Sequence, residues 1–268
     1  MKYEEFKKRI VTELLEKLPE VSARLERVVK VNRAEDVLLV ASKDSTGEAF
    51  VSLCFWLNDI YEPTADDLNE IIDGIVQSIK ANFPKDCNNW IDIVSSADKI
   101  KNLVYPSMVN AERNYEYLKV HPHKEFLDLA VVYYMSVGNE SVCITNQILQ
   151  KIELSVEELH RCAVANLKNS LFAFGPMYIV TNEDNYLGSG SILKENIAAE
   201  ICERLESEQF YMFPSSIHEW IVIPTNEIDL AYAKQMVKSI NRMTDCVPEW
   251  DWLSDNVYIY DGREYRIV

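Results

Sequence analysis

The 268-residue sequence predicts an α+β fold, with a largely antiparallel sheet built from repeated hairpin–helix units and helices packed against it. Over residues 36–83, 127–172 and 209–243, extended apolar runs precede a run with helical periodicity. The sustained strand–helix–strand alternation of a doubly wound parallel sheet is missing. Hydrophobic residues make up 48% of the chain, which is ample for a packed core, and the length allows one large unit or two small ones, with a possible internal boundary near 84–95.

Local signals define the elements of the first third. Residues 3–18 carry apolar side chains at helical spacing and stop before Pro19, which predicts a helix. Thr64 is expected to cap a second amphipathic helix that ends near Phe83. Turn residues 43–47 favour a hairpin between the last two of the three predicted strands, which cover 27–32, 36–42 and 48–56.

The middle third mixes short helices with strands. The predicted elements are helices over 96–104 and 108–118, strands over 125–137 and 141–146, and a helix over 157–172. The strand over 125–137 is apolar on both faces, which indicates a central position in the sheet. Ser155, followed three residues later by Glu158, forms a capping box at the start of the last helix.

The last third contains the third hairpin–helix unit. Its predicted elements are a strand over 177–182, a loop over 185–191, a helix over 192–206, strands over 209–213 and 219–224, a helix over 229–243 and a strand over 255–260. The two strands at its centre are expected to pair around their short connection.

Charge is the most unusual bulk property of the chain. The formal net charge is −16, and residues 44–79 contain no Lys or Arg. Such a field repels phosphates and anionic lipids, so we expect no direct nucleic-acid partner and no membrane partner. We expect a basic protein to bind the acidic residues of the second predicted helix, Asp66, Asp67, Glu70 and Asp73. The alternatives are a merely solvated face and an acidic mimic of nucleic acid.

The cellular compartment follows from hydropathy and cysteine usage. No window approaches about 18 uncharged apolar residues, the length that a membrane-spanning helix needs, and the amphipathic N-terminal run differs from a signal peptide. The six cysteines stand singly, with no C-x-x-C pair, which is typical of reduced thiols. We therefore expect a cytoplasmic protein.

The segment PSSIHE brings together the densest set of reactive side chains, namely Ser215, Ser216, His218 and Glu219. A serine hydrolase needs its nucleophile within hydrogen-bond reach of a base, usually on a glycine-flanked elbow. No glycine flanks either serine, and residues two apart on a strand lie about 6.5–7 Å apart. Serines beside proline commonly pin turns, so a structural turn is the favoured interpretation and catalysis the alternative.

The histidines offer only weak metal or catalytic patterns. His121 and His123 flank a proline and could project from one face as metal ligands, with a third ligand from His218, Glu219, Glu125 or Asp128. No stronger ligand spacing supports this site, so we expect no metal. His160 and Cys162 lie on different faces of a predicted helix, which favours a packing role for His160.

No cofactor motif stands out. The segment Gly188–Ser191 precedes a predicted helix and could hold a phosphate, but it lacks the third glycine of a dinucleotide fingerprint and the lysine of a P-loop. We expect no cofactor.

Near the C-terminus, the aromatic residues Trp250, Trp252, Tyr258 and Tyr260 either anchor an interface or close the core.

Several segments carry a family resemblance. The pattern FPSSIHE followed by LSDNVYIY, together with LVYPSMVNAERNYEYLKVHPHKEFLDLAVVYY and SVEELHRCAVANL, resembles an uncharacterised domain-of-unknown-function family from anaerobic gut bacteria. The resemblance covers most of the chain beyond about residue 20. It implies one integrated cytosolic unit, which we expect to extend over 1–268, and it brings no activity, cofactor or catalytic residue.

The leading functional hypothesis is a non-enzymatic module that binds a macromolecule through an acidic surface. A hydrolase or metal-dependent enzyme using PSSIHE is the first alternative, and an acidic mimic of nucleic acid is the second. The binding module and the enzyme differ in the geometry that they require, because catalysis needs the reactive groups of PSSIHE in one open pocket.

Overall fold

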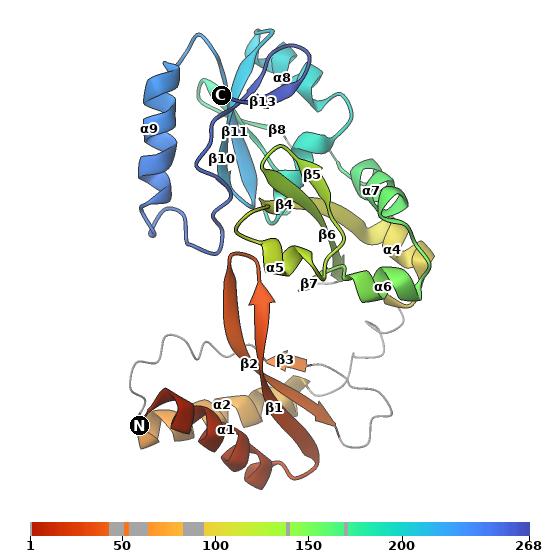
Figure 1. The fold of residues 1–268 in the computed structure, drawn as a ribbon, viewed down its shortest axis with the longest axis vertical. Coiled ribbons are helices and arrows are strands. Elements are labelled where there is room, and N and C mark those ends of the chain that lie inside the picture. The colour runs from red at the N-terminus through yellow and green to blue at the C-terminus, as the bar shows by residue number, and fades with distance from the viewer. Residues whose placement is uncertain (1, 43–50, 54–63, 83–93, 138–139, 169–170) are drawn as a thin grey trace. The chain divides into compact units, whose positions relative to one another are not determined.

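The computed structural model describes residues 2–42, 51–53, 64–82, 94–137, 140–168 and 171–268, and it is drawn in Figure 1. The chain divides into two compact units, residues 1–91 and residues 92–268. The single integrated unit stays a prediction, and the boundary expected near 84–95 falls mainly on residues outside the described ones. Within the described residues, no helix is long and apolar enough to cross a membrane.

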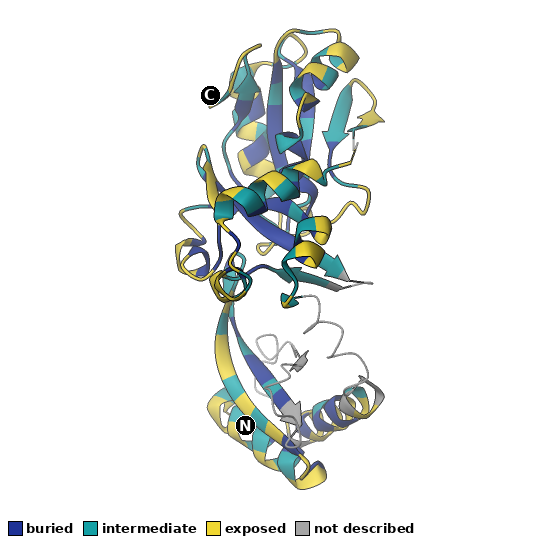
Figure 2. Cartoon of the chain, turned by 90° about the vertical axis from the view of Figure 1, so that its right-hand side faces the viewer, coloured by how far each residue is buried: buried dark blue, intermediate teal, exposed yellow. Residues whose placement is uncertain are grey.

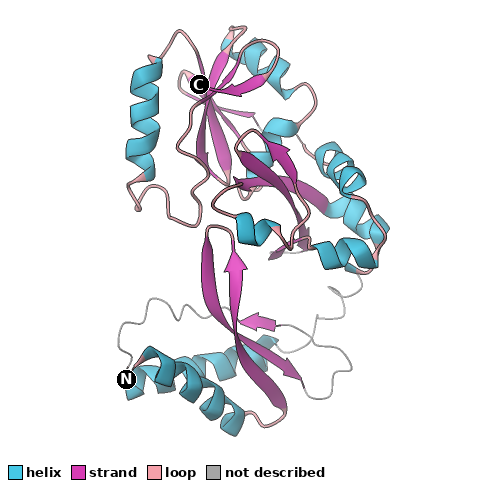
Figure 3. Ribbon diagram, in the orientation of Figure 1, coloured by secondary structure: helices cyan, strands magenta, loops and turns pink. Residues whose placement is uncertain are grey.

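In its described residues, the N-terminal unit consists of two helices and an antiparallel sheet in the order β1-β2-β3 (Figure 3). The elements are α1 (Tyr3–Lys17), β1 (Val21–Lys30), β2 (Arg33–Ser42), β3 (Val51–Leu53) and α2 (Ala65–Asn82). Fully buried Phe6, Ile10 and Leu14 of α1 share one core with Leu68 and Ile72 of α2. Burying this apolar surface is the main force that holds the helices on the sheet.

Two helices of this unit were correctly predicted by periodicity and capping. α1 ends one residue before its predicted end. At the start of α2 the Thr64 hydroxyl accepts from the Asp67 amide at 3.2 Å, and the Asp67 carboxylate accepts from the Thr64 amide at 2.8 Å. This reciprocal pair satisfies two amides that the helix itself leaves unbonded.

The first hairpin differs from the prediction. β1 begins at Val21, earlier than expected, and a two-residue turn with Asn32 at φ 61° joins it to β2. Asn tolerates this left-handed conformation better than most residues, which suits it to a tight hairpin turn. The expected hairpin connection at 43–47 lies outside the described residues, although β2 and β3 do pair in antiparallel fashion.

The C-terminal unit contains two antiparallel sheets. The first has β6 at its centre and consists of β4 (Val104–Asn110), β5 (Lys124–Phe126), β6 (Leu129–Val137) and β7 (Glu140–Cys143). The second has the order β13-β12-β10-β11-β9-β8 and consists of β8 (Leu171–Phe174), β9 (Met177–Val180), β10 (Phe210–Ser216), β11 (Glu219–Pro224), β12 (Tyr258–Tyr260) and β13 (Tyr265–Ile267). The central strands of both sheets are buried (Figure 2).

Helices pack against these sheets, which confirms the α+β fold class. The helices of this unit are α4 (Ala97–Leu103), α5 (Tyr115–Leu118), α6 (Asn146–Lys151), α7 (Val156–Ala165), the 3₁₀ helix η2 (Gly188–Leu193), α8 (Ile197–Leu205) and α9 (Leu230–Asn241). α7 packs on β4 and β6, whereas α9 buries Ala233 and Val237 against Phe213 and Ile223 of the second sheet. Asp229, the expected first residue of the helix over 229–243, is the N-cap of α9.

Several predicted elements of this unit are wrong. The helix expected over 108–118 is strand β4 followed by the single turn α5, and the strand expected over 125–137 is the hairpin β5–β6 with Leu127 at φ 57° in its turn. Ser155 caps α7 as predicted, but the helix ends at Ala165 and not at residue 172. The loop expected over 185–191 becomes η2, so that α8 begins only at Ile197.

Candidate functional site

The PSSIHE segment forms the hairpin turn between β10 and β11, and its own side chains close the turn. The Ser215 hydroxyl donates to a carboxylate oxygen of Glu219 at 3.1 Å. The Ser216 hydroxyl accepts from the backbone N–H of His218 at 3.1 Å. The pairing register shifts between Pro214 and Ser216, which marks an irregularity in β10 beside the turn. Both serine hydroxyls therefore have partners within the turn.

The imidazole of His218 is bonded on both of its nitrogens. Nδ1 accepts a hydrogen bond from the backbone N–H of Leu187 at 2.9 Å. Nε2 lies 3.2 Å from Oδ1 of Asp251, and Tyr186 stacks on the ring with centroids 5.1 Å apart. Because Nδ1 is an acceptor, the proton of the neutral ring sits on Nε2 and points to Asp251.

This geometry separates His218 from serine chemistry. A general base must have a free lone pair within hydrogen-bond reach of the hydroxyl that it deprotonates. The only lone pair of the neutral ring is occupied by Leu187, and the described contacts include no bond between the imidazole and Ser215 or Ser216. The arrangement instead ties the turn to the segment before η2 and to the chain near Asp251, where the Ile217 amide also donates to the Asp251 carbonyl at 2.8 Å.

The glycine-rich segment that precedes α8 is buried against this turn. The Ser189 amide donates to the carbonyl of Ile217 at 3.2 Å, and the Ser189 carbonyl accepts from the indole of Trp220 at 2.7 Å. The Ser189 hydroxyl accepts from the Met108 amide at 2.8 Å. All residues from Gly188 to Ile192 are buried, so this segment packs the core and does not present its amides to a phosphate.

The two histidines of the HPH segment make separate contacts with the backbone. His121 is buried, stacks on Tyr117 with centroids 3.8 Å apart, and bonds through Nδ1 to the Tyr117 carbonyl at 2.8 Å. His123 bonds through Nδ1 to the His121 carbonyl at 3.0 Å. Among the described residues, no group of three His, Cys, Asp or Glu side chains could hold a metal ion.

Burial of His121 predicts a loss of stability in acid. Desolvation lowers the pKa of His121 below its usual value, and the bond to Tyr117 offsets this only in part. The unfolded chain therefore binds a proton at pH values where the folded chain does not, so stability falls as the pH drops below about 6.5, by at most about 1.4 kcal/mol per pH unit. We expect His121→Gln to lose less stability than the natural chain between about pH 7.5 and pH 5.5 in urea unfolding.

The same substitution at His123 is the matched control for this experiment, since His123 is the exposed neighbour. His123→Gln should follow the natural chain over the whole pH range. Some acid sensitivity should persist in His121→Gln, because burial also lowers the pKa of His160. Identical pH profiles for all three proteins would contradict a role for His121.

The four acidic residues expected to bind a partner are all exposed on α2, but they differ in their contacts. Asp67 closes the helix cap, and hydrogen bonds from Thr64 lower the pKa of its carboxyl group. Asp73 forms an ion pair with Lys17 of α1. Asp66 and Glu70 have no ion pair or hydrogen bond within the described residues, and their spacing of four places them on one face.

The terminal segment LSDNVYIY converges on a single carboxylate of the β5–β6 turn. Oδ2 of Asp128 accepts from the Ser254 hydroxyl at 3.0 Å and from the Asn256 amide group at 2.9 Å. Oδ1 accepts from the Tyr258 hydroxyl at 2.6 Å. Three donors on one carboxylate link the β5–β6 turn of the first sheet to β12 of the second sheet and to the residues that precede it.

The aromatic residues near the C-terminus divide between core and surface. Tyr258 is buried and meets Trp220 edge to face with centroids 5.2 Å apart, and Tyr260 stacks on Phe210. These two close the core. Trp252 lies under the guanidinium of Arg113 at 5.2 Å, and Trp250 is 44% exposed.

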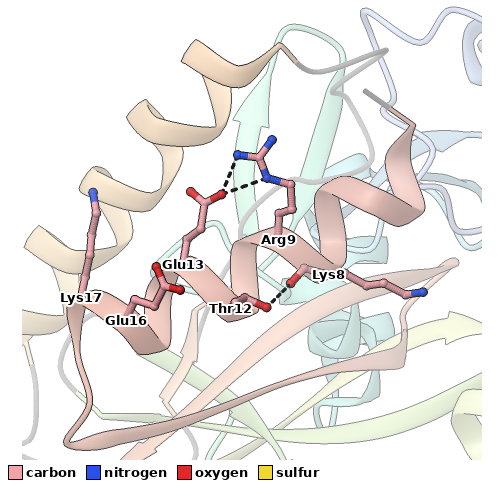
Figure 4. A pocket seen from close by; sticks show the side chains of 6 residues that line it. All are labelled: Lys8, Arg9, Thr12, Glu13, Glu16 and Lys17. Carbon is pink, nitrogen blue, oxygen red and sulfur yellow. Dashed lines mark hydrogen bonds and ion pairs between the residues drawn. The ribbon is translucent and has the colours of Figure 1, made fainter.

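One hollow lies on the outer face of α1 and does not constitute a site. Its lining comes from a single helix and is charged: Lys8, Arg9, Thr12, Glu13, Glu16 and Lys17 (Figure 4). Arg9 pairs with Glu13 at 2.6 Å, and the Thr12 hydroxyl bonds back to the Lys8 carbonyl. Side chains satisfied within one helix face are typical of a solvated surface.

The polar contact of His160 was not predicted from the sequence. Nδ1 of His160 lies 3.0 Å from the hydroxyl of Tyr133, a buried residue of β6. The two residues are 27 positions apart, so no local motif could have predicted the contact. His160 also lines an open hollow, together with residues that precede α8.

Comparison with known proteins gives one result. A family model described as a family of unknown function, DUF5688, matches residues 3–174 and residues 169–262. No curated protein matches the chain. No solved structure matches it either. Since the matched residues include almost the whole sequence, the chain belongs to the family of unknown function DUF5688.

Proposed function

We propose that this protein is a non-enzymatic, cytoplasmic binding module that docks a basic protein on the α2 acidic surface, defined by Asp66 and Glu70. The observation that carries the proposal is that both carboxylates are exposed and have no counter-ion within the described residues. The surrounding sequence from 44 to 79 supplies no Lys or Arg that could neutralise them. Unpaired charge of one sign attracts partners of the other and speeds their association.

The geometry of the PSSIHE turn supports binding over catalysis. The described bonds occupy both nitrogens of His218, so its imidazole has no free lone pair with which to deprotonate Ser215 or Ser216. The cysteines support the cytoplasmic part of the proposal. Cys143, Cys162, Cys202 and Cys246, the four that the structure describes, are free thiols, as is usual in a reducing compartment.

Charge reversal at the two unpaired positions tests the surface. Asp66→Lys/Glu70→Lys should weaken binding of poly-L-lysine, used as a model basic polypeptide, by at least about tenfold in Kd at low salt. The reason is that two attractions are replaced by two repulsions. Asp67 and Asp73 are left intact, because reversing them would also disrupt the α2 cap and the ion pair with Lys17. Fluorescence anisotropy of labelled poly-L-lysine measures the Kd.

A variant of equal net charge separates this surface from a general charge effect. Glu203→Lys/Glu227→Lys changes two exposed carboxylates of the other unit that form no side-chain hydrogen bond or ion pair within the described residues. It should leave the Kd within about twofold of the natural chain, since distant exposed charges are screened. Equal weakening by both double variants would show that only the total charge matters, and the α2 acidic surface would be rejected as a docking site.

A further inference from the structure

An open hollow of about 630 Å³ lies between α7 and the segment that enters α8, and we name it the α7–α8 hollow. Its polar lining includes His160 and Arg161 of α7 and Lys194 before α8. Its apolar lining includes Val164, Leu167 and Leu193. A volume of about 300–1,000 Å³ with apolar walls and a few polar groups is typical of small-molecule sites.

The charges of this hollow are opposite to those of the chain as a whole. Neither Arg161 nor Lys194 has an ion pair within the described residues. Glu158, one turn before Arg161 on α7, forms its ion pair with Lys101 at 2.7 Å, and its pKa is lowered by Lys101 first and by the charge of Arg161 to a smaller extent. The one carboxylate of the lining, Glu195, leaves the lining net positive, in a chain whose formal charge is −16. A hollow with a net positive lining attracts an anion from solution.

His160 adds a hydrogen-bond donor to the two cations. Burial raises the pKa of the Tyr133 hydroxyl, and nearby Glu157 adds to this effect, so Tyr133 keeps its proton and can donate it to Nδ1 of His160, 3.0 Å away. Burial, together with the charge of Lys124, lowers the pKa of His160 and favours its neutral form. A neutral ring that accepts at Nδ1 carries its proton on Nε2, and Nε2 has no partner within the described residues.

We propose that the α7–α8 hollow binds a small organic phosphate. Arg161 and Lys194 contact the phosphate, Nε2–H of His160 donates to one of its oxygens, and the organic group packs on Val164, Leu167 and Leu193. Arg is suited to this role because its planar guanidinium can bond two phosphate oxygens at once. A phosphate dianion also matches two cations better than a carboxylate does. The proposal is independent of the α2 acidic surface, which lies in the other unit.

Phenyl phosphate is the probe for this site, because it joins a phosphate to a small apolar ring. Isothermal titration should show saturable binding at one site with a Kd of about 1 mM or tighter. Phenol should bind at least about tenfold more weakly, and so should benzoate, which carries a single charge. Arg161→Gln/Lys194→Gln should weaken phenyl phosphate by at least about tenfold while leaving thermal unfolding unchanged, since surface substitutions rarely affect stability.

The matched control removes one arginine and one lysine elsewhere. Lys238→Gln/Arg242→Gln changes two exposed residues at the end of α9 and should leave the Kd for phenyl phosphate unchanged. Absence of saturable binding, or an equal loss in both double variants, would overturn the site. Equal affinity for phenol or for benzoate would overturn the phosphate assignment. Asp66→Lys/Glu70→Lys should still bind phenyl phosphate normally, so failure of either proposal is visible without the other.

Discussion

Gly190→Ala is expected to lower the free energy of unfolding of the C-terminal unit by about 3 kcal/mol or more. A Cβ added at Gly190 would lie 2.1 Å from the carbonyl oxygen of Pro106 and 2.5 Å from its carbonyl carbon. These atoms belong to the backbone of β4, so the clash cannot be relieved by rotating a side chain. Either η2 or β4 must move, and moving η2 would also strain the bonds that Ser189 makes. Chemical unfolding followed by circular dichroism measures the effect.

Gly74→Ala is the matched control, and it should have the opposite sign. Gly74 lies exposed within α2, and an added Cβ would meet nothing within 4 Å. Alanine in a helix interior is more favourable than glycine by about 1 kcal/mol, so this variant should be slightly more stable. If Gly190→Ala unfolds at the same denaturant concentration as the natural chain, the close packing of η2 on β4 is wrong.

The parts of the fold that could be predicted are those with local signals. α1, α2 and α9 each carry an apolar stripe, and Thr64 and Ser155 cap helices as predicted. Both the stripe and the cap are properties of a short stretch of chain. The stripe and the cap can therefore be recognised in a single sequence.

The elements that were missed depend on distant partners. β4 has the sequence VYPSMVN, in which Ser107 and Asn110 obscure the apolar pattern, and it becomes a strand by pairing with β6. The β5–β6 turn needs a positive φ at Leu127, a residue that rarely adopts one. β8 and β13 are short edge strands at the two ends of one sheet, and their few residues give little periodicity.

The candidate site also has a part that local sequence predicts and a part that depends on distant residues. The turn at PSSIHE could be predicted because proline and serine act on their own backbone. The partners of His218 could not, since Leu187 and Asp251 lie about 30 residues away on either side in the sequence. On α2 the exposure of the carboxylates could be expected from helical periodicity, but the ion pair of Asp73 with Lys17 could not, because it joins residues 56 positions apart.

Asp128→Ala is expected to cost about 4 kcal/mol of stability in the C-terminal unit. Its carboxylate accepts from Ser254, Asn256 and Tyr258, and hydrogen bonds to a charged group contribute about 1.5–3 kcal/mol each before the structure relaxes. Ser254 is 1% exposed and Tyr258 is 0% exposed, so neither hydroxyl can readily bond to water once the carboxylate is gone. A buried donor without an acceptor costs about 1–3 kcal/mol. Urea unfolding measures the loss.

Two further variants test whether this cost comes from the three bonds. Glu125→Ala removes an exposed carboxylate from the adjacent strand β5 and should change stability by less than about 0.5 kcal/mol. Tyr258→Phe removes one donor and leaves the other two in place, so it should cost about 1–2 kcal/mol. In the double variant with Asp128→Ala this cost should largely disappear, because Tyr258 no longer has the carboxylate as its acceptor. Additive costs would mean that Tyr258 and Asp128 act independently, and the carboxylate would not be the link between the terminal segment and the β5–β6 turn.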